Sequence, residues 1–161
     1  MNILCLDIGN TSITFSEVSN DVTQLKRLSK SKDAINFFKN YNTNNIEEVV
    51  ISSVVPNLSN QIIENFKSKQ IRVFEISYKN CGIHLLVQNP SEVGNDRICN
   101  IAAANKLYGG KSIVIDFGTA TTYDITNDKG AFIGGAIAPG IDVSADNLIS
   151  KASLLKETVY Q

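Results

Sequence analysis

Two segments of the chain place a carboxylate, a glycine and polar turn residues in the same order. The first runs from Asp7 to Thr11 (DIGNT), and the second runs from Asp116 to Thr119 (DFGT). Glycine permits the backbone conformations of a tight turn, and successive amide N–H groups in such a turn can bind phosphate oxygens. Because a carboxylate beside a phosphate requires a bridging cation, the repeated pattern predicts that both segments handle a metal-bound nucleotide.

A single corner of this kind is more simply explained as a hairpin turn, since Asp, Gly and Asn are common turn residues. Here each corner follows an apolar, strand-like run, and a second strand-like run returns after it. Two such copies favour phosphate binding over a plain turn. An internal repeat also indicates the architecture, and this one predicts two similar lobes that face one cleft.

A third candidate is the carboxylate of Asp96, which lies near the start of a predicted helix with Arg97 beside it. The helix N-terminus would keep Asp96 ionised and able to accept a hydrogen bond from a substrate alcohol, as phosphoryl transfer requires. Arg97 could hold a substrate carboxylate or the transferring phosphoryl group, and Gly94 indicates a close approach to the backbone. The alternative is an Asp and an Arg on the solvated face of an ordinary helix.

Other catalytic motifs do not fit the sequence. The segment from Gly110 to Ser112 resembles the end of a P-loop, but Asn105 stands where the earlier glycine is required, and the segment follows a helix rather than a strand. No G-x-G-x-x-G follows a strand, and no G-x-S-x-G elbow is present. The single histidine, His84, has apolar neighbours and is interpreted as a structural residue on a strand.

Short apolar runs rich in Ile and Val alternate with helical patterns, which is typical of an α/β domain. Strands are predicted at Ile3–Asp7, Ile13–Val18, Val49–Val54, Arg72–Ile76, Ser112–Asp116, Thr121–Ile125 and Ala131–Ala138. Helices are predicted at Ala34–Tyr41, at Leu58–Phe66 after Pro56, from Pro90 to about Tyr108 with Ser91 as a cap, and after Gly140.

The composition fits a globular protein of 161 residues, long enough for one large domain or two small ones. Fifteen Lys and Arg residues against sixteen Asp and Glu residues give no basic patch, so no nucleic-acid partner is expected. The first residues lack a signal-peptide pattern, and no apolar run is long enough for a membrane span. The widely spaced Cys5, Cys81 and Cys99 indicate reduced thiols, so a cytoplasmic protein with no membrane contact is predicted.

Four sequence blocks, taken in order, resemble the type III pantothenate kinases. They are residues 7–11, Asn89-Pro90 with residues 93–97, residues 116–122 and residues 134–140. One such block is weak evidence, whereas the ordered set spans nearly the whole chain and is specific. The resemblance implies an enzyme that transfers the γ-phosphate of ATP to the 4′-hydroxyl of pantothenate, the first step of coenzyme A biosynthesis.

The resemblance also implies roles for individual residues, with Asp96 as the general base. It assigns the ATP phosphates to Asp7, Gly9, Asn10, Thr11 and Thr119, Mg²⁺ to Asp7 through the phosphates, and a monovalent cation, potassium or ammonium, to Asp116. It assigns pantothenate to Gly94, Asn95, Asp96, Arg97 and the position of Val87. The family usually has a Tyr where this chain has Val87, so the sequence departs from the family pattern in this part of the substrate pocket.

The fold implied by the resemblance is that of the actin/Hsp70/sugar-kinase superfold. It consists of two ribonuclease H-like lobes, each with a mixed sheet flanked by helices. Residues 1–110 would form the N-terminal lobe, and residues 111–161 would begin a second, duplicated lobe. That second lobe is expected to be incomplete, because the chain resembles a family member truncated at its C-terminus. The resemblance further implies a homodimer.

Two alternatives to the pantothenate kinase remain open from the sequence. The first is a non-catalytic regulator of the same family that resembles the Bvg accessory factor. The second is a kinase of the same superfold that acts on another small acceptor. The intact acidic residues Asp7, Asp96 and Asp116 favour an enzyme, because a pure regulator has no need of a general base.

Overall fold

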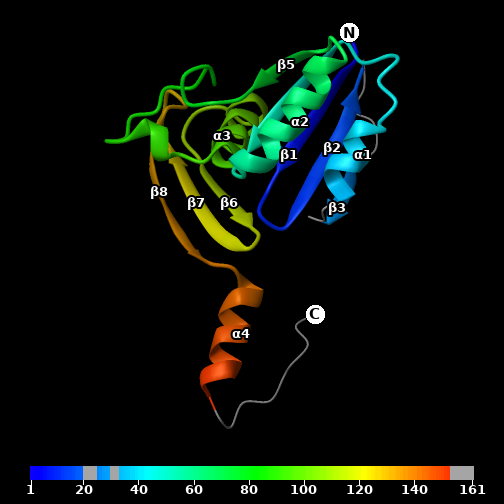
Figure 1. Ribbon diagram of the computed structural model, residues 1–161. Coiled ribbons are helices and arrows are strands. Elements are labelled where there is room, and N and C mark those ends of the chain that lie inside the picture. The colour runs from blue at the N-terminus through cyan, green and yellow to red at the C-terminus, as the bar shows by residue number, and fades with distance from the viewer. Residues whose placement is uncertain (20–24, 30–32, 153–161) are drawn as a thin grey trace.

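The computed structural model describes residues 1–19, 25–29 and 33–152 (Figure 1). Its N-terminal part is a five-stranded sheet in the order β3-β2-β1-β4-β5. The strands are β1 (Ile3–Ile8), β2 (Ser12–Val18), β3 (Lys26–Ser29), β4 (Glu48–Ser53) and β5 (Arg72–Glu75). The sheet is mixed, because β1 pairs antiparallel with β2 and parallel with β4. The parallel register places Ser52 of β4 opposite Asp7 of β1.

The side chains of β1 alternate between the buried core and the opposite face of the sheet. Leu4 and the other even-numbered residues of this strand are buried in a core that includes Phe38 and Phe66. These two rings come from the helices α1 (Asp33–Lys39) and α2 (Pro56–Ser68), which lie over the sheet in Figure 1. Because successive side chains of a strand point to opposite faces, Cys5 and Asp7 point away from this core.

The second sheet is antiparallel and has the order β6-β7-β8. Its strands are β6 (Ile113–Phe117), β7 (Ala120–Thr126) and β8 (Phe132–Pro139), and helix α4 (Ile141–Lys151) follows β8. In Figure 1, α4 projects beyond the end of this sheet. The hairpin of β6 and β7 therefore repeats the hairpin of β1 and β2, as the internal repeat in the sequence predicts.

Helix α3 (Asn95–Leu107) connects the two sheets. It contacts β4 on one side and β6 and β7 on the other, and its Ile98 and Ile101 are fully buried there. Residues in the first turns of α3 consequently lie at the junction of the two sheets. Within the described ranges, no helix has the length and apolar character needed to cross a bilayer.

The α/β class, with sheets flanked by helices, is confirmed, and every predicted strand is found within one residue of its predicted ends. Strand β3 was not predicted, because its sequence KRLS is short and mostly polar. His84 was predicted to lie on a strand, and this is wrong. It lies in an irregular segment, where its carbonyl accepts the backbone N–H of Phe132 at 2.9 Å and its side chain is exposed.

The predicted start of the third helix at Pro90 is also wrong. Residues 90–92 form a separate 3-10 turn, Val93 and Gly94 are extended, and α3 begins at Asn95. Ser91 therefore does not cap α3, whose preceding residue is Gly94. The helix begins at Asn95 because the side chain of this residue donates a hydrogen bond to the carbonyl of Ser53 at 3.1 Å, which ties the start of α3 to the end of β4.

Replacing Phe66 by Ala should lower the free energy of unfolding by about 3–5 kcal/mol, because it leaves a cavity among fully buried side chains. Phe74 of β5 is 42% exposed, so Phe74→Ala is the matched control and should cost about 1 kcal/mol or less. Urea denaturation of both variants measures the difference. Equal losses would show that Phe66 does not have the place in the core described above.

Candidate active site

The two Asp-x-Gly corners lie opposite one another. The Oγ1 atoms of Thr11 and Thr119 are 2.7 Å apart and share a hydrogen bond. Each corner is a tight turn closed by a backbone hydrogen bond, from Gly9 N–H to the Ser12 carbonyl at 3.0 Å and from Gly118 N–H to the Ala120 carbonyl at 3.1 Å. The hydroxyl groups of the two turns therefore meet at the mouth of the cleft between the sheets.

Gly140 fixes the second corner. Its backbone N–H donates to the carbonyl of Thr119 at 3.0 Å, and a Cβ atom at this position would lie 2.7 Å from that carbonyl oxygen. No side chain fits in this space, so Gly140 allows the chain leaving β8 to pack directly on the turn that carries Thr119. The glycine-rich block at residues 134–140 thus shapes the cleft partly through the close approach of its backbone.

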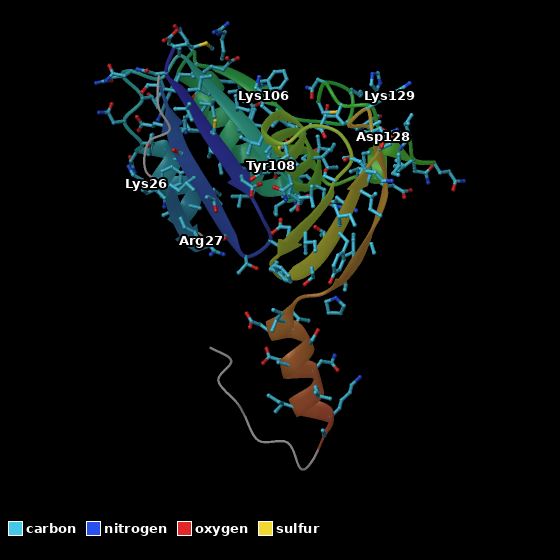
Figure 2. The ribbon with its side chains drawn as sticks, turned by 180° about the vertical axis from the view of Figure 1, so that it is seen from behind. Lys26, Arg27, Lys106, Tyr108, Asp128 and Lys129 are labelled. Carbon is cyan, nitrogen blue, oxygen red and sulfur yellow. The ribbon has the colours of Figure 1, made fainter. Side chains whose placement is uncertain are left out.

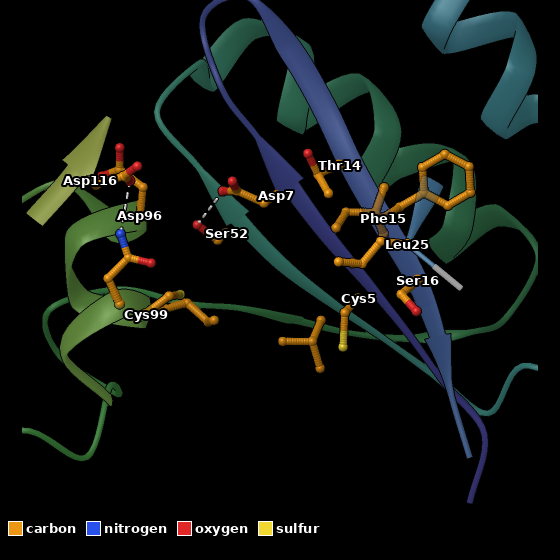
Figure 3. Close-up of a pocket in the computed structure, with 14 residues that line it drawn as sticks. Cys5, Asp7, Thr14, Phe15, Ser16, Leu25, Ser52, Asp96, Cys99 and Asp116 are labelled. Atoms are coloured by element: carbon orange, nitrogen blue, oxygen red, sulfur yellow. Dashed lines mark hydrogen bonds between the residues drawn. The ribbon is translucent and has the colours of Figure 1, made fainter. Parts of the chain in front are cut away.

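A cavity of about 350 Å³ lies between the first sheet and α3. Its lining includes Asp7 of β1, Asp96 of α3 and Asp116 of β6, so three carboxylates from three elements face one space (Figure 3). Two of them have fixed polar partners. Ser52 Oγ donates to Asp7 Oδ1 at 3.0 Å, and Asn100 Nδ2 donates to Asp116 Oδ2 at 2.9 Å.

The surroundings of Asp7 disfavour its ionised form. Burial among its neighbours is the main cause that raises the pKa of Asp7 above 3.8, and the negative charges of Asp96 and Asp116 raise it further. The hydrogen bond from Ser52 acts in the opposite direction and lowers this pKa. Asp7 is nevertheless exposed to solvent, which screens part of the effect of burial on its pKa, so a cation or a cation-bound ligand can reach it.

Carboxylate and amide oxygens are the donors that Mg²⁺ and similar hard cations prefer. In residues 1–19, 25–29 and 33–152, however, no three His, Cys, Asp or Glu side chains are close enough to form a metal site by themselves. A divalent cation at these carboxylates would therefore need further oxygen ligands, as the phosphates of a nucleotide could provide. The donor set thus fits a metal that arrives with its ligand.

Asp96 lies in the first turn of α3, and its Oδ1 accepts the backbone N–H of Arg97 at 2.8 Å. Its Oδ2 has no hydrogen-bond partner among the described residues, which leaves this atom available to a bound hydroxyl group. Gly94 leaves room beside it, because a Cβ there would lie 2.5 Å from Asp96 Oδ1 and the carboxylate would have to move. The close approach that the glycine indicated in the sequence is thus made by the Asp96 carboxylate itself.

Not every residue assigned to the site lines the cavity. Arg97 points toward the second sheet, where its guanidinium pairs with Asp124 of β7. Asn95 uses its side-chain amide on the carbonyl of Ser53. Val87 is half-buried in the irregular segment beside Phe132 and is not among the residues that line the cavity.

Two polar groups of this region escaped the sequence analysis. Asp124 is fully buried against α3, and Asn100 holds the Asp116 carboxylate. The alternation of polar and apolar residues along β7 could have indicated that Asp124 faces the same side as Thr122. Its partner on α3 could not have been identified in this way, because the pairing depends on how the helix lies across the sheet.

The arrangement of two β-hairpin corners around one cleft belongs to the actin/Hsp70/sugar-kinase superfold, and solved structures share this fold. A Baf family transcriptional activator described as putative, from Campylobacter jejuni, aligns with a TM-score of 0.61 at 21% identity, over 98% of this chain and 68% of its own. The activator of 2-hydroxyisocaproyl-CoA dehydratase from Clostridium difficile, solved with bound ADPNP, aligns with a TM-score of 0.51 at 13% identity, over 97% of this chain and 53% of its own. At these identities the likeness concerns the fold alone.

The sequence family is more specific. Residues 3–160 match the model of the type III pantothenate kinases, and the chain belongs to this family. It is 37% identical to the type III pantothenate kinase of Agathobacter rectalis over 96% of this chain and 65% of the relative. It is 36% identical to that of Moorella thermoacetica over 95% of this chain and 66% of the relative. The chain thus spans about two thirds of the length of these curated relatives.

Replacing Asp7 by Asn should raise the melting temperature at neutral pH in the absence of divalent cations. Because folding raises the pKa of Asp7 above 3.8, its ionised form opposes folding at a pH above the folded-state pKa. Below 3.8 both states are protonated and this penalty vanishes. The increase in melting temperature should therefore be present at neutral pH and shrink as the pH falls through the raised pKa of Asp7.

Thermal melts of the wild type and the variant across this pH range provide the measurement. Asp128→Asn is the control, because Asp128 is an exposed carboxylate in the turn between β7 and β8, at the end of the second sheet remote from α4 (Figure 2). A lower melting temperature for Asp7→Asn than for the wild type at neutral pH would contradict the account of the cavity.

Proposed function

We propose that the chain transfers the γ-phosphoryl group of ATP to the 4′-hydroxyl of pantothenate. Membership of the type III pantothenate kinase family supports this proposal. The single observation that carries it is the convergence of Asp96 with Asp7 and Asp116 on one cavity beside the facing corners. Phosphoryl transfer needs this combination of charge neutralisation, alignment and a group that orients the attacking hydroxyl.

In this proposal the two corners hold the phosphates of ATP. Thr11 and Thr119 donate hydroxyl hydrogen bonds to phosphate oxygens in place of the bond that now joins them. Gly9 and Asn10 form the turn of the first corner, where the backbone can come close to the ligand. The nucleotide thereby bridges the hairpins of both sheets.

Asp96 is the proposed general base. Its Oδ2 is free to accept the hydrogen bond of the pantothenate hydroxyl, while Oδ1 is held by the backbone N–H of Arg97. Gly94, Asn95, Arg97 and the position of Val87 are the proposed surroundings of pantothenate, and of these Arg97 supplies the positive charge that a carboxylate would seek.

Two of these carboxylates, Asp7 and Asp116, are the proposed cation ligands. Asp7 would hold Mg²⁺ together with the phosphates of ATP, and Asp116, oriented by Asn100, would hold potassium or ammonium. When bound, such cations neutralise the charge of the phosphates and of the transferring group. The chain's own contribution is to keep the carboxylate oxygens facing the cleft.

Other features stay predictions. These are the division into lobes at residues 1–110 and 111–161, the homodimer and the cytoplasmic location. The presence of two separate sheets supports the division into lobes. Residues 153–161 of the second lobe lie outside the described residues.

Release of ADP from Mg²⁺ and ATP, measured with and without pantothenate in potassium and in sodium buffers, tests the proposed function. Pantothenate-dependent release that is faster in potassium is the expected result. Release that pantothenate does not change would favour a kinase with another acceptor. No release by the folded protein would contradict the kinase and favour a non-catalytic member of the family.

Asp96→Asn should lower kcat by about 100-fold or more, because the amide cannot accept the proton. ATP binding should be unchanged, since this residue faces the acceptor in the proposal. Steady-state kinetics and calorimetric titration with ATP measure the two effects. Asp146→Asn, on the exposed surface of α4, is the control, and normal turnover of Asp96→Asn would remove Asp96 from its role.

A further inference from the structure

Arg97 and Asp124 form a buried ion pair at the junction of α3 and the second sheet. Asp124 Oδ1 accepts a hydrogen bond from Arg97 Nε at 2.8 Å and forms an ion pair with Nη2 at 2.5 Å. The side chain of Arg97 is 13% exposed and that of Asp124 is 1% exposed. A charge-assisted pair with so little solvent has a well-defined geometry, so the guanidinium of Arg97 is held in one orientation.

Two further residues surround the guanidinium. Its Cζ atom lies 5.6 Å from the centre of the Phe132 ring, within the range of a cation–π contact. Gly135 of β8 leaves the necessary space, because a Cβ there would lie 2.6 Å from Nη2 and 3.0 Å from Asp124 Oδ1. Arg97 of α3 is therefore fixed by residues of both β7 and β8.

The ion pair leaves some of its hydrogen-bonding atoms without partners. Asp124 Oδ2 is buried and has no hydrogen-bond partner, and Nη1 of Arg97 has none among the described residues. A buried ion pair whose hydrogen-bonding atoms are not all satisfied contributes less to stability than well-packed apolar residues of similar size. The planar guanidinium has donors beyond those that face Asp124, and these remain for a ligand.

The position of the pair indicates the ligand. Arg97 directly follows Asp96, whose carboxylate accepts its backbone N–H, so fixing the Arg97 side chain also fixes the turn that carries the proposed base. We propose that Asp124 is a positioning residue, which orients Arg97 so that its free donors bind the carboxylate of the acceptor. This inference rests on the proposed function and adds a residue that determines specificity for a carboxylate-bearing acceptor.

Asp124→Asn tests the proposal, because Asn keeps the shape and one acceptor oxygen but removes the charge. The acceptors to compare are pantothenate and its alcohol analogue, in which a hydroxymethyl group replaces the carboxylate. The KM for pantothenate should rise by about tenfold or more. The KM for the alcohol and the KM for ATP should change little, because neither contact uses Arg97. Calorimetric titration with both acceptors gives the same comparison without turnover.

Arg97→Lys is the second variant, since it keeps the charge and loses the planar fork. Its KM for pantothenate should also rise while its KM for the alcohol changes little. The double variant should add little to either single change, because both substitutions act through one contact. Asp128→Asn is the matched control. A loss of stability in Asp124→Asn that prevents the assay leaves Arg97→Lys to decide.

Equal losses for both acceptors, a parallel rise in the KM for ATP, or no change at all would overturn the positioning role. These outcomes differ from a failure of the proposed function. In that case the wild type itself would neither turn over nor bind pantothenate, and the inference would fall with it.

Discussion

The convergence of three carboxylates on one cavity is the constraint on which the site depends. Asp7, Asp96 and Asp116 come from three elements and face one cavity, and the raised pKa of Asp7 reflects its burial and its acidic neighbours. A fold that only needed stability would keep such groups apart. Ser52 and Asn100 each donate a hydrogen bond to one of these carboxylates, and the bond from Ser52 lowers the pKa of Asp7.

The architecture brings these groups together through duplication and one connecting helix. Each sheet contributes a hairpin whose first strand ends in Asp-x-Gly, and the two turns meet through Thr11 and Thr119. Helix α3 contacts both sheets, so its first turn carries Asp96 to the junction. The anchors of this turn come from each side, from the Ser53 carbonyl in the first sheet and from Asp124 in the second. The position of the proposed base therefore depends on how the two sheets lie relative to one another.

The strands and the paired corners could be predicted from the sequence, because they depend on local alternation, on glycine and on a repeat that is visible in the chain. The start of α3 could not, since Pro90 marks a separate turn and the helix begins where Asn95 reaches the Ser53 carbonyl across 42 positions of sequence. The short polar strand β3 was also missed, because its pairing with β2 supplies what its own residues do not indicate. The partner of Arg97 was missed for a similar reason, since it is set by packing between elements.

The most direct test of this account is the affinity for ATP with and without Mg²⁺, measured by calorimetric titration. If the repelling carboxylates accept the nucleotide only together with its cation, ATP should bind at least about tenfold more tightly in the presence of Mg²⁺ than with a chelator. The Asp7→Asn variant should lose most of this difference. Equal binding of ATP with and without the metal would contradict the proposal that the cleft takes a cation-bound nucleotide.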